Sequence, residues 1–168
     1  HSTHLMPFFG VRCTPGGRFF AQTLVQFDFD ANGNPVKVFN SQTNLLQTVG
    51  RANDGSYVYV GQQIGYWLQR PGVVHGGIAA VGELQWTRSM RNPDHIRGQN
   101  STGETFDFSS SGQLDIYNLV LGLNAQLGNA SNIMLGYARP MGGGQDQQFD
   151  GEIRLVYNLY FGGNRDRL

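Results

Sequence analysis

The sequence predicts an all-β protein, namely an antiparallel transmembrane β-barrel or the C-terminal portion of a larger barrel, with about seven or eight strands of its own. Three observations predict this fold. Apolar and polar residues alternate with a period of two along most of the chain. The alternating segments are much longer than the ~5–6 residues of an average strand in soluble proteins. Short and long connections follow each other in turn, which is the order found in membrane barrels.

Composition narrows the functional classes. The chain has 168 residues, and 12 Lys and Arg balance 12 Asp and Glu, so no excess positive charge predicts a nucleic-acid partner. The single Cys excludes a disulfide framework within the chain and a multi-thiolate metal site. The apolar content of 39% is too high for a disordered tail. No run approaches the ~18 apolar residues of a transmembrane helix. A transmembrane strand would not produce such a run, because its apolar residues alternate with polar ones.

Seven segments carry the alternation: residues 4–12, 18–30, 56–70, 77–90, 113–127, a shorter run around 133–137, and 149–161. The pattern is clearest in 113–127, where an apolar row that includes Leu121 and Leu123 faces away from Asn124. A strand that crosses a membrane needs ~9–11 residues, and the longer segments reach that length. Such strands fit a barrel with lipid outside and water inside. A soluble β-sandwich would instead bury the same apolar rows in a protein core.

The connections between these segments alternate in length. They are short at 13–17, 71–76 and 128–131, and long and polar at 31–54 and 91–112. On this alternation the first strand starts on the side of the long loops and the seventh ends on the side of the tight turns. Single-chain bacterial barrels usually have an even number of strands, so we expect further strands upstream, unless residues 36–39 add an eighth strand. Residues 162–168 then form a C-terminal tail.

Aromatic residues lie near the ends of several apolar rows. Tyr66, Trp86 and Tyr117 are examples. Membrane barrels carry aromatic girdles at both interfaces, although aromatic residues are also common in strands of every kind.

The polar rows predict the residues that would line the interior of a barrel. These candidates are Gln22, Gln26, Asp28, Gln63, Glu83, Gln85, Asn118, Asn124, Gln126, Asp150, Glu152, Arg154 and Asn158. They would either line a water-filled path, with charges that set selectivity, or pair with each other in a filled lumen. Asp150, Glu152 and Arg154 share one face at two-residue spacing, which suits an internal series of ion pairs.

Residues for catalysis or metal binding are not expected. Ser89 and His95 are the nearest approach to a nucleophile and base, and nothing orients them. Cys13 has no neighbouring His that would favour a thiolate. His1 and His4 lack a third ligand nearby. We therefore expect no enzyme activity, no metal and no cofactor.

The last segment, residues 152–161 (EIRLVYNLYF), resembles the terminal strand of bacterial outer-membrane β-barrel proteins, which typically ends on alternating apolar residues and an aromatic. More narrowly, residues 5–12 (LMPFFGVR), 18–22 (RFFAQ) and 149–152 (FDGE) resemble uncharacterised porin-like proteins of planctomycete-type bacteria, which are loosely similar to proteins of aromatic-compound uptake. The resemblance implies a location in the bacterial outer membrane and supplies no catalytic or binding residues.

These observations lead to one functional expectation and two alternatives. We expect an outer-membrane channel or uptake protein that lets small solutes pass through a polar lumen, in contact with outer-membrane lipid and with upstream strands of the same protein or other envelope subunits. The first alternative is a non-conducting structural or assembly component of the cell envelope. The second is a soluble β-sandwich or lipocalin-like binding protein.

Overall fold

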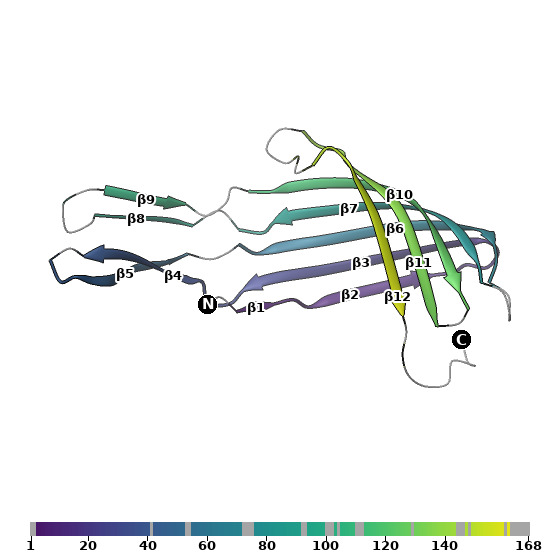
Figure 1. Cartoon of the computed structure of the whole chain (residues 1–168), viewed down its shortest axis with the longest axis horizontal. Helices are drawn as coiled ribbons and strands as arrows, with labels where there is room; N and C mark the ends of the chain where they lie inside the picture. Colours follow the sequence, from purple (N-terminus) through teal and green to yellow (C-terminus); the bar gives the residue numbers. More distant parts are fainter. Residues whose placement is uncertain are drawn as a thin grey trace. The chain divides into compact units, whose positions relative to one another are not determined.

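The computed structural model is built of β-strands only. It describes residues 3–40, 42–52, 55–71, 76–91, 94–99, 103, 105–109, 113–128, 130–143, 147, 149–159 and 161, and no helix occurs among them. The strands are β1 (His4–Leu5), β2 (Phe8–Cys13), β3 (Phe19–Asp30), β4 (Asn34–Asn40), β5 (Leu45–Ala52), β6 (Tyr57–Gln69), β7 (Ile78–Ser89), β8 (His95–Gln99), β9 (Thr105–Ser109), β10 (Asp115–Leu127), β11 (Ser131–Pro140) and β12 (Glu152–Leu159), shown in Figure 1. The predicted all-β class is confirmed. The C-terminal tail 162–168 lies outside the described residues.

The main sheet follows the chain as a meander. Its order is β1-β3-β6-β7-β10-β11-β12, and β2 also pairs with β3. The seven segments predicted from the alternation coincide with the strands of this sheet, and the first segment is divided into β1 and β2. The division falls at Pro7, which has no N–H to donate. The carbonyl oxygen of Pro7 still accepts a hydrogen bond from the N–H of Phe27 at 2.9 Å, so the pairing with β3 continues across the break.

The described strands do not form a closed barrel. Neighbouring strands pair antiparallel, as the registers of β1 with β3, β10 with β11, and β11 with β12 show. Among the described residues, however, no ladder joins β12 to β1 or β2. The described strands therefore establish an antiparallel sheet.

Two hairpins lie within the connections that we expected to be long and polar. β4 pairs with β5, and β8 pairs with β9, each as a separate two-stranded sheet. The turn between β4 and β5 has a clear local cause: Asn40 Oδ1 accepts hydrogen bonds from the N–H groups of Gln42 and Thr43, and Asn44 adopts a left-handed φ of 56°. The predicted extra strand at 36–39 lies within β4, but no ladder among the described residues joins β4 to the main sheet.

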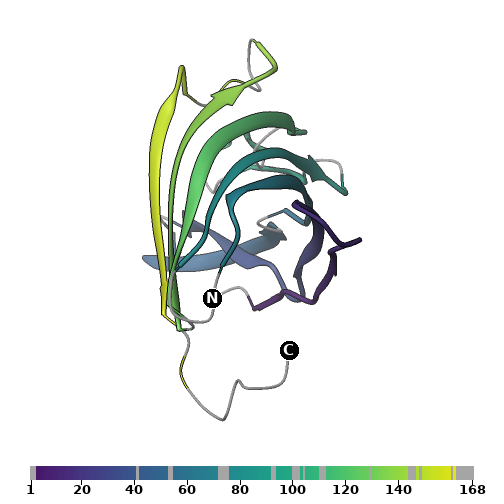
Figure 2. The same cartoon turned by 90° about the vertical axis from the view of Figure 1, so that its right-hand side faces the viewer.

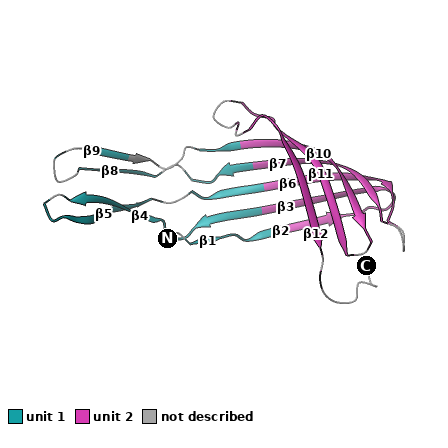
Figure 3. Cartoon of the chain, in the orientation of Figure 1, with its two compact units in different colours: residues 1–8, 26–59, 87–115 teal, residues 9–25, 60–86, 116–168 magenta. Residues whose placement is uncertain are grey.

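The chain divides into two compact units, which Figure 3 shows in different colours. Unit 1 comprises His1–Phe8, Gln26–Tyr59 and Thr87–Asp115, and so contains both hairpins. Within it, the side chain of Ile96 on β8 lies against Gly50 on β5. Unit 2 comprises Phe9–Val25, Val60–Trp86 and Ile116–Leu168.

Unit 2 contains a small apolar cluster near the short connections. Phe20, Ala79 and Val81 are buried, and Trp67 and Met134 pack against them. The ring of Phe20 lies directly on Gly65, where a Cβ atom would overlap it. Glycine at that position therefore leaves the space that the aromatic ring fills.

Candidate functional site

In unit 2 the outward face of the sheet is apolar and exposed. Leu121 and Leu123 on β10 are 59% and 51% exposed. The register places Leu121 beside Tyr137 and Leu123 beside Leu135 on β11, and Leu135 beside Leu155 on β12. These side chains form one continuous apolar surface across three strands. Further exposed apolar residues of the unit include Phe19, Ile64, Tyr66, Leu68, Ile78, Leu84, Tyr117, Leu119, Leu127, Ile153, Tyr157 and Leu159.

The opposite face carries a connected series of polar side chains. Glu83 on β7 accepts hydrogen bonds from Gln63 Nε2 at 3.3 Å and from Gln85 Nε2 at 2.8 Å. Gln63 is only 7% exposed, and Glu83 and Gln85 are half-buried. The two amides thus give each carboxylate oxygen of Glu83 a hydrogen-bond donor.

Arg154 links this series to the far edge of the sheet. Its Nη1 donates to Gln85 Oε1 at 2.8 Å and its Nε donates to Glu152 Oε1 at 2.9 Å. Two strands, β10 and β11, separate β7 from β12 in the sheet order, so the backbones would lie ~14 Å apart if the sheet were flat. Side chains that point the same way from a flat sheet would not meet over that distance. The sheet of unit 2 is accordingly curved, as the strands in Figure 2 show, and the polar face is concave.

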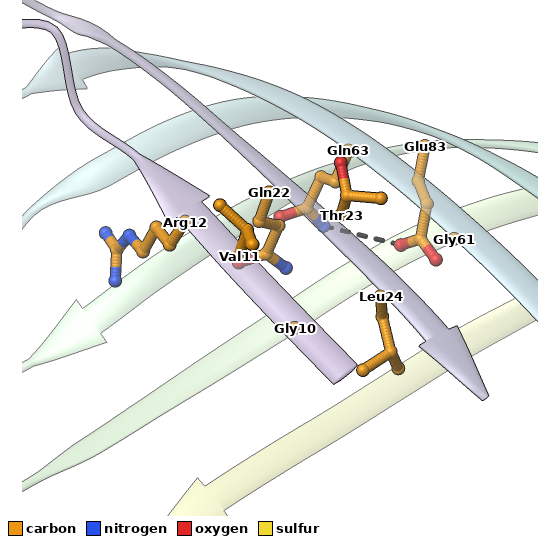
Figure 4. Close-up of a pocket in the computed structure, with 9 residues that line it drawn as sticks. All are labelled: Gly10, Val11, Arg12, Gln22, Thr23, Leu24, Gly61, Gln63 and Glu83. Carbon is orange, nitrogen blue, oxygen red and sulfur yellow. Dashed lines mark hydrogen bonds between the residues drawn. The ribbon is translucent and has the colours of Figure 1, made fainter. Parts of the chain in front are cut away.

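A cavity of about 340 Å³ lies on this side of β2, β3, β6 and β7. Arg12, Gln22, Gln63 and Glu83 contribute its polar wall, and Val11 and Leu24 contribute aliphatic surface (Figure 4). The Arg12 guanidinium lies over the ring of Phe20, 5.5 Å from its centroid. Figure 4 shows Arg12 and Glu83 at opposite ends of the group, with Gln22 and Gln63 between them.

The structure brings six of the predicted lumen residues together in unit 2. Gln22, Gln63 and Glu83 line the cavity, and Gln85, Glu152 and Arg154 continue the hydrogen-bonded series from Glu83. The expected ion pair on β12 forms between Glu152 and Arg154. Asp150 is not part of it, because Asp150 precedes β12 and accepts a hydrogen bond from Gln147 Nε2 at 3.0 Å.

The other predicted residues lie apart from this group. Asn118, Asn124 and Gln126 are half-buried on β10; Gln126 donates to the carbonyl oxygen of Gly128, and Asn118 Oδ1 is buried with no hydrogen-bond partner among the described residues. Asn158 donates to Asn132 Oδ1 at 2.8 Å.

Gln26 and Asp28 belong to unit 1. There Asp28 Oδ1 lies 2.6 Å from His4 Nδ1.

Sequence reasoning missed two residues with such contacts, Arg12 in unit 2 and His4 in unit 1. Arg12 lines the cavity, and His4 pairs with Asp28 although it was considered only as a metal ligand. Alternation alone could have placed Arg12 on the same face as Gly10, two residues earlier. Because Pro7 interrupts the first segment, the sequence does not indicate which of its side chains point to the concave face.

Two absences hold for the described part of the chain. No three His, Cys, Asp or Glu side chains there gather as a metal site would require. None of its residues form a helix long and apolar enough to cross a membrane.

Comparison with known proteins finds no match among protein-family models, curated proteins or solved structures.

Proposed function

We propose that this chain is the membrane-spanning part of a bacterial outer-membrane channel through which small polar solutes pass passively. The observation that carries the proposal is the polarity of the sheet in unit 2: leucines such as Leu121, Leu123 and Leu155 are 51–66% exposed on one face, while Gln63 and Glu83 lie on the other. A soluble sheet covers its apolar face with a second layer. No described segment covers this one.

The energetic cost of leaving that face in water supports lipid as its environment. Full burial of one leucine side chain is worth about 1.5–3 kcal/mol, and contiguous apolar patches beyond a few hundred Å² mark interaction surfaces. The apolar rows of β10, β11 and β12 are in register with each other and form such a patch. Acyl chains would remove it from water without any further protein layer.

The length of the strands fits a bilayer. β10 has 13 residues, which span about 41 Å at ~3.4 Å per residue. At the ~40° tilt of membrane barrels this corresponds to roughly 31 Å along the membrane normal, close to the ~30 Å thickness of the hydrocarbon.

Aromatic pairs at both ends of the apolar face support the same orientation. Phe19 and Tyr66 meet edge to face with ring centroids 4.9 Å apart, next to the short connections. Trp86 and Tyr117 stack at 6.2 Å, next to the long connection between β7 and β10. Amphipathic rings favour the headgroup level, so two such pairs would mark the two interfaces.

One observation favours the non-conducting alternative. Phe20, Trp67, Ala79 and Val81 fill the inner face near the short connections, and the bond from Arg154 to Gln85 crosses that face. Small barrels are filled by such side chains, whereas larger ones leave a channel. A structural component of the envelope is therefore the second candidate.

The proposal is tested by fractionation followed by electrophysiology. The chain is expected to require detergent, to migrate on gels in a heat-modifiable way, and to produce discrete conductance steps in planar lipid bilayers. A detergent-dependent protein without conductance would support the structural alternative. A stable monomer in buffer without detergent would refute both membrane functions.

A further inference from the structure

The cavity of unit 2 is bordered by two opposite charges that lack ionic partners. Arg12 contacts the ring of Phe20, and Glu83 accepts hydrogen bonds from the amides of Gln63 and Gln85. Neither charge takes part in an ion pair among the described residues.

At two other places among the described residues, an acidic side chain has a basic partner. Arg154 pairs with Glu152 at 2.9 Å, and His4 lies 2.6 Å from Asp28. Glu83 is half-buried whereas Arg12 is exposed, and a charge that is partly withdrawn from water favours an opposite charge nearby. Arg12 and Glu83 border the same cavity but do not meet. An occupant that carries both charges would satisfy each of them.

The residues between the two charges restrict the chemical groups that a ligand in this cavity could carry. Gln63 is 93% buried, its amide nitrogen is engaged by Glu83, and its carbonyl oxygen forms no hydrogen bond with the described residues. The oxygen therefore offers an acceptor for a donor group next to Glu83. Val11 and Leu24 supply aliphatic surface. A volume of about 340 Å³ lies at the lower end of the ~300–1,000 Å³ that ligand pockets have.

We propose that this cavity is a subsite for small zwitterionic solutes with a short aliphatic body. The ammonium group lies against Glu83 and the carbonyl oxygen of Gln63, and the carboxylate lies against Arg12, whose guanidinium suits that planar anion. This inference rests on the proposed function, because it places the subsite on the path of the transported solute and names the class of solute.

The test uses four probes with the same four-carbon skeleton: 4-aminobutanoate carries both charges, butylamine only the positive one, butanoate only the negative one, and 1-butanol neither. Each is titrated calorimetrically into the detergent-solubilised chain. We expect 4-aminobutanoate to bind at least about tenfold more tightly than the other three, because each charge-assisted contact is worth a factor of this order. Equal affinities for the four probes would overturn the proposal without the need for any variant.

Charge-removing variants locate the site. R12Q and E83Q should each weaken 4-aminobutanoate binding by about tenfold or more, to the level of a singly charged probe. R88Q and D107N remove exposed charges that do not line the cavity, and they should leave binding unchanged. Circular dichroism and heat-modifiable migration check that each variant folds. Folded R12Q and E83Q proteins with unchanged affinity would refute the assignment.

Measurements of permeation into liposomes test the proposed subsite and the proposed channel independently. Conductance with equal permeation of all four probes into liposomes would refute the subsite and leave the channel standing. Selective binding of 4-aminobutanoate without permeation or conductance would support the subsite and refute the channel.

Discussion

Substitution of arginine for Leu121 tests which medium surrounds the apolar face. Leu121 is the middle residue of the 13-residue strand β10, and its side chain is 59% exposed. Leu127, the last residue of the same strand, is 52% exposed on the same face. The two leucines thus differ little in exposure but lie at different depths of a membrane, if the strand spans one.

The expected magnitudes follow from that depth. Six residues at ~3.4 Å, tilted by ~40°, place Leu127 roughly 16 Å from Leu121 along the membrane normal, which is about half the hydrocarbon thickness. Arginine at the midplane of a barrel costs about 2–4 kcal/mol, and near the interface about 0–1 kcal/mol. Leu121→Arg should therefore lower the free energy of unfolding by about 2–3 kcal/mol more than Leu127→Arg does.

The assay is reversible urea unfolding in lipid vesicles, followed by tryptophan fluorescence. In an aqueous protein both positions are exposed surface, where substitutions usually change stability by less than about 0.5 kcal/mol. Equal, small effects of Leu121→Arg and Leu127→Arg would refute the lipid-facing assignment. A large effect at Leu121 alone would support it.

Three further predictions follow from the packing of side chains and from the hairpins. Gly65→Ala should destabilise the fold by about 1–3 kcal/mol in the same urea assay, because its Cβ overlaps the ring of Phe20, whereas Gly143→Ala, with no atom nearby, should change little. Arg154→Ala should raise single-channel conductance in planar bilayers, because it removes the bond that crosses the concave face; unchanged conductance would mean that this bond lies off the solute path. Replacement of residues 34–52 by a short turn should preserve heat-modifiable migration, because no ladder among the described residues joins β4 or β5 to the main sheet; loss of that migration would show that the hairpin is required for folding of the main sheet.

The sequence alone located the strands of the main sheet and separated their two faces. The alternation in residues 113–127 and 77–90 corresponds to β10 and β7 almost residue for residue. Side chains of a strand alternate between faces for local geometric reasons, so the pattern needs no knowledge of neighbours. For the same reason Leu121 and Asn124 could be assigned to opposite faces. Apart from the candidate strand at 36–39, which lies within β4, the strands of the hairpins were missed because the polar residues of 31–54 and 91–112 resemble those of open loops.

Only the tertiary structure decided which polar residues of the inner face meet. The contact of Arg154 with Gln85 spans two intervening strands, and Arg12 and Glu83 border one cavity although 70 residues separate them in the chain. Both depend on the curvature and register of the sheet, which arise from packing among several strands and not from the alternation within any one of them. The alternation in the sequence determines the face of the strand from which each side chain projects, whereas the curvature of the sheet determines which other side chains it contacts.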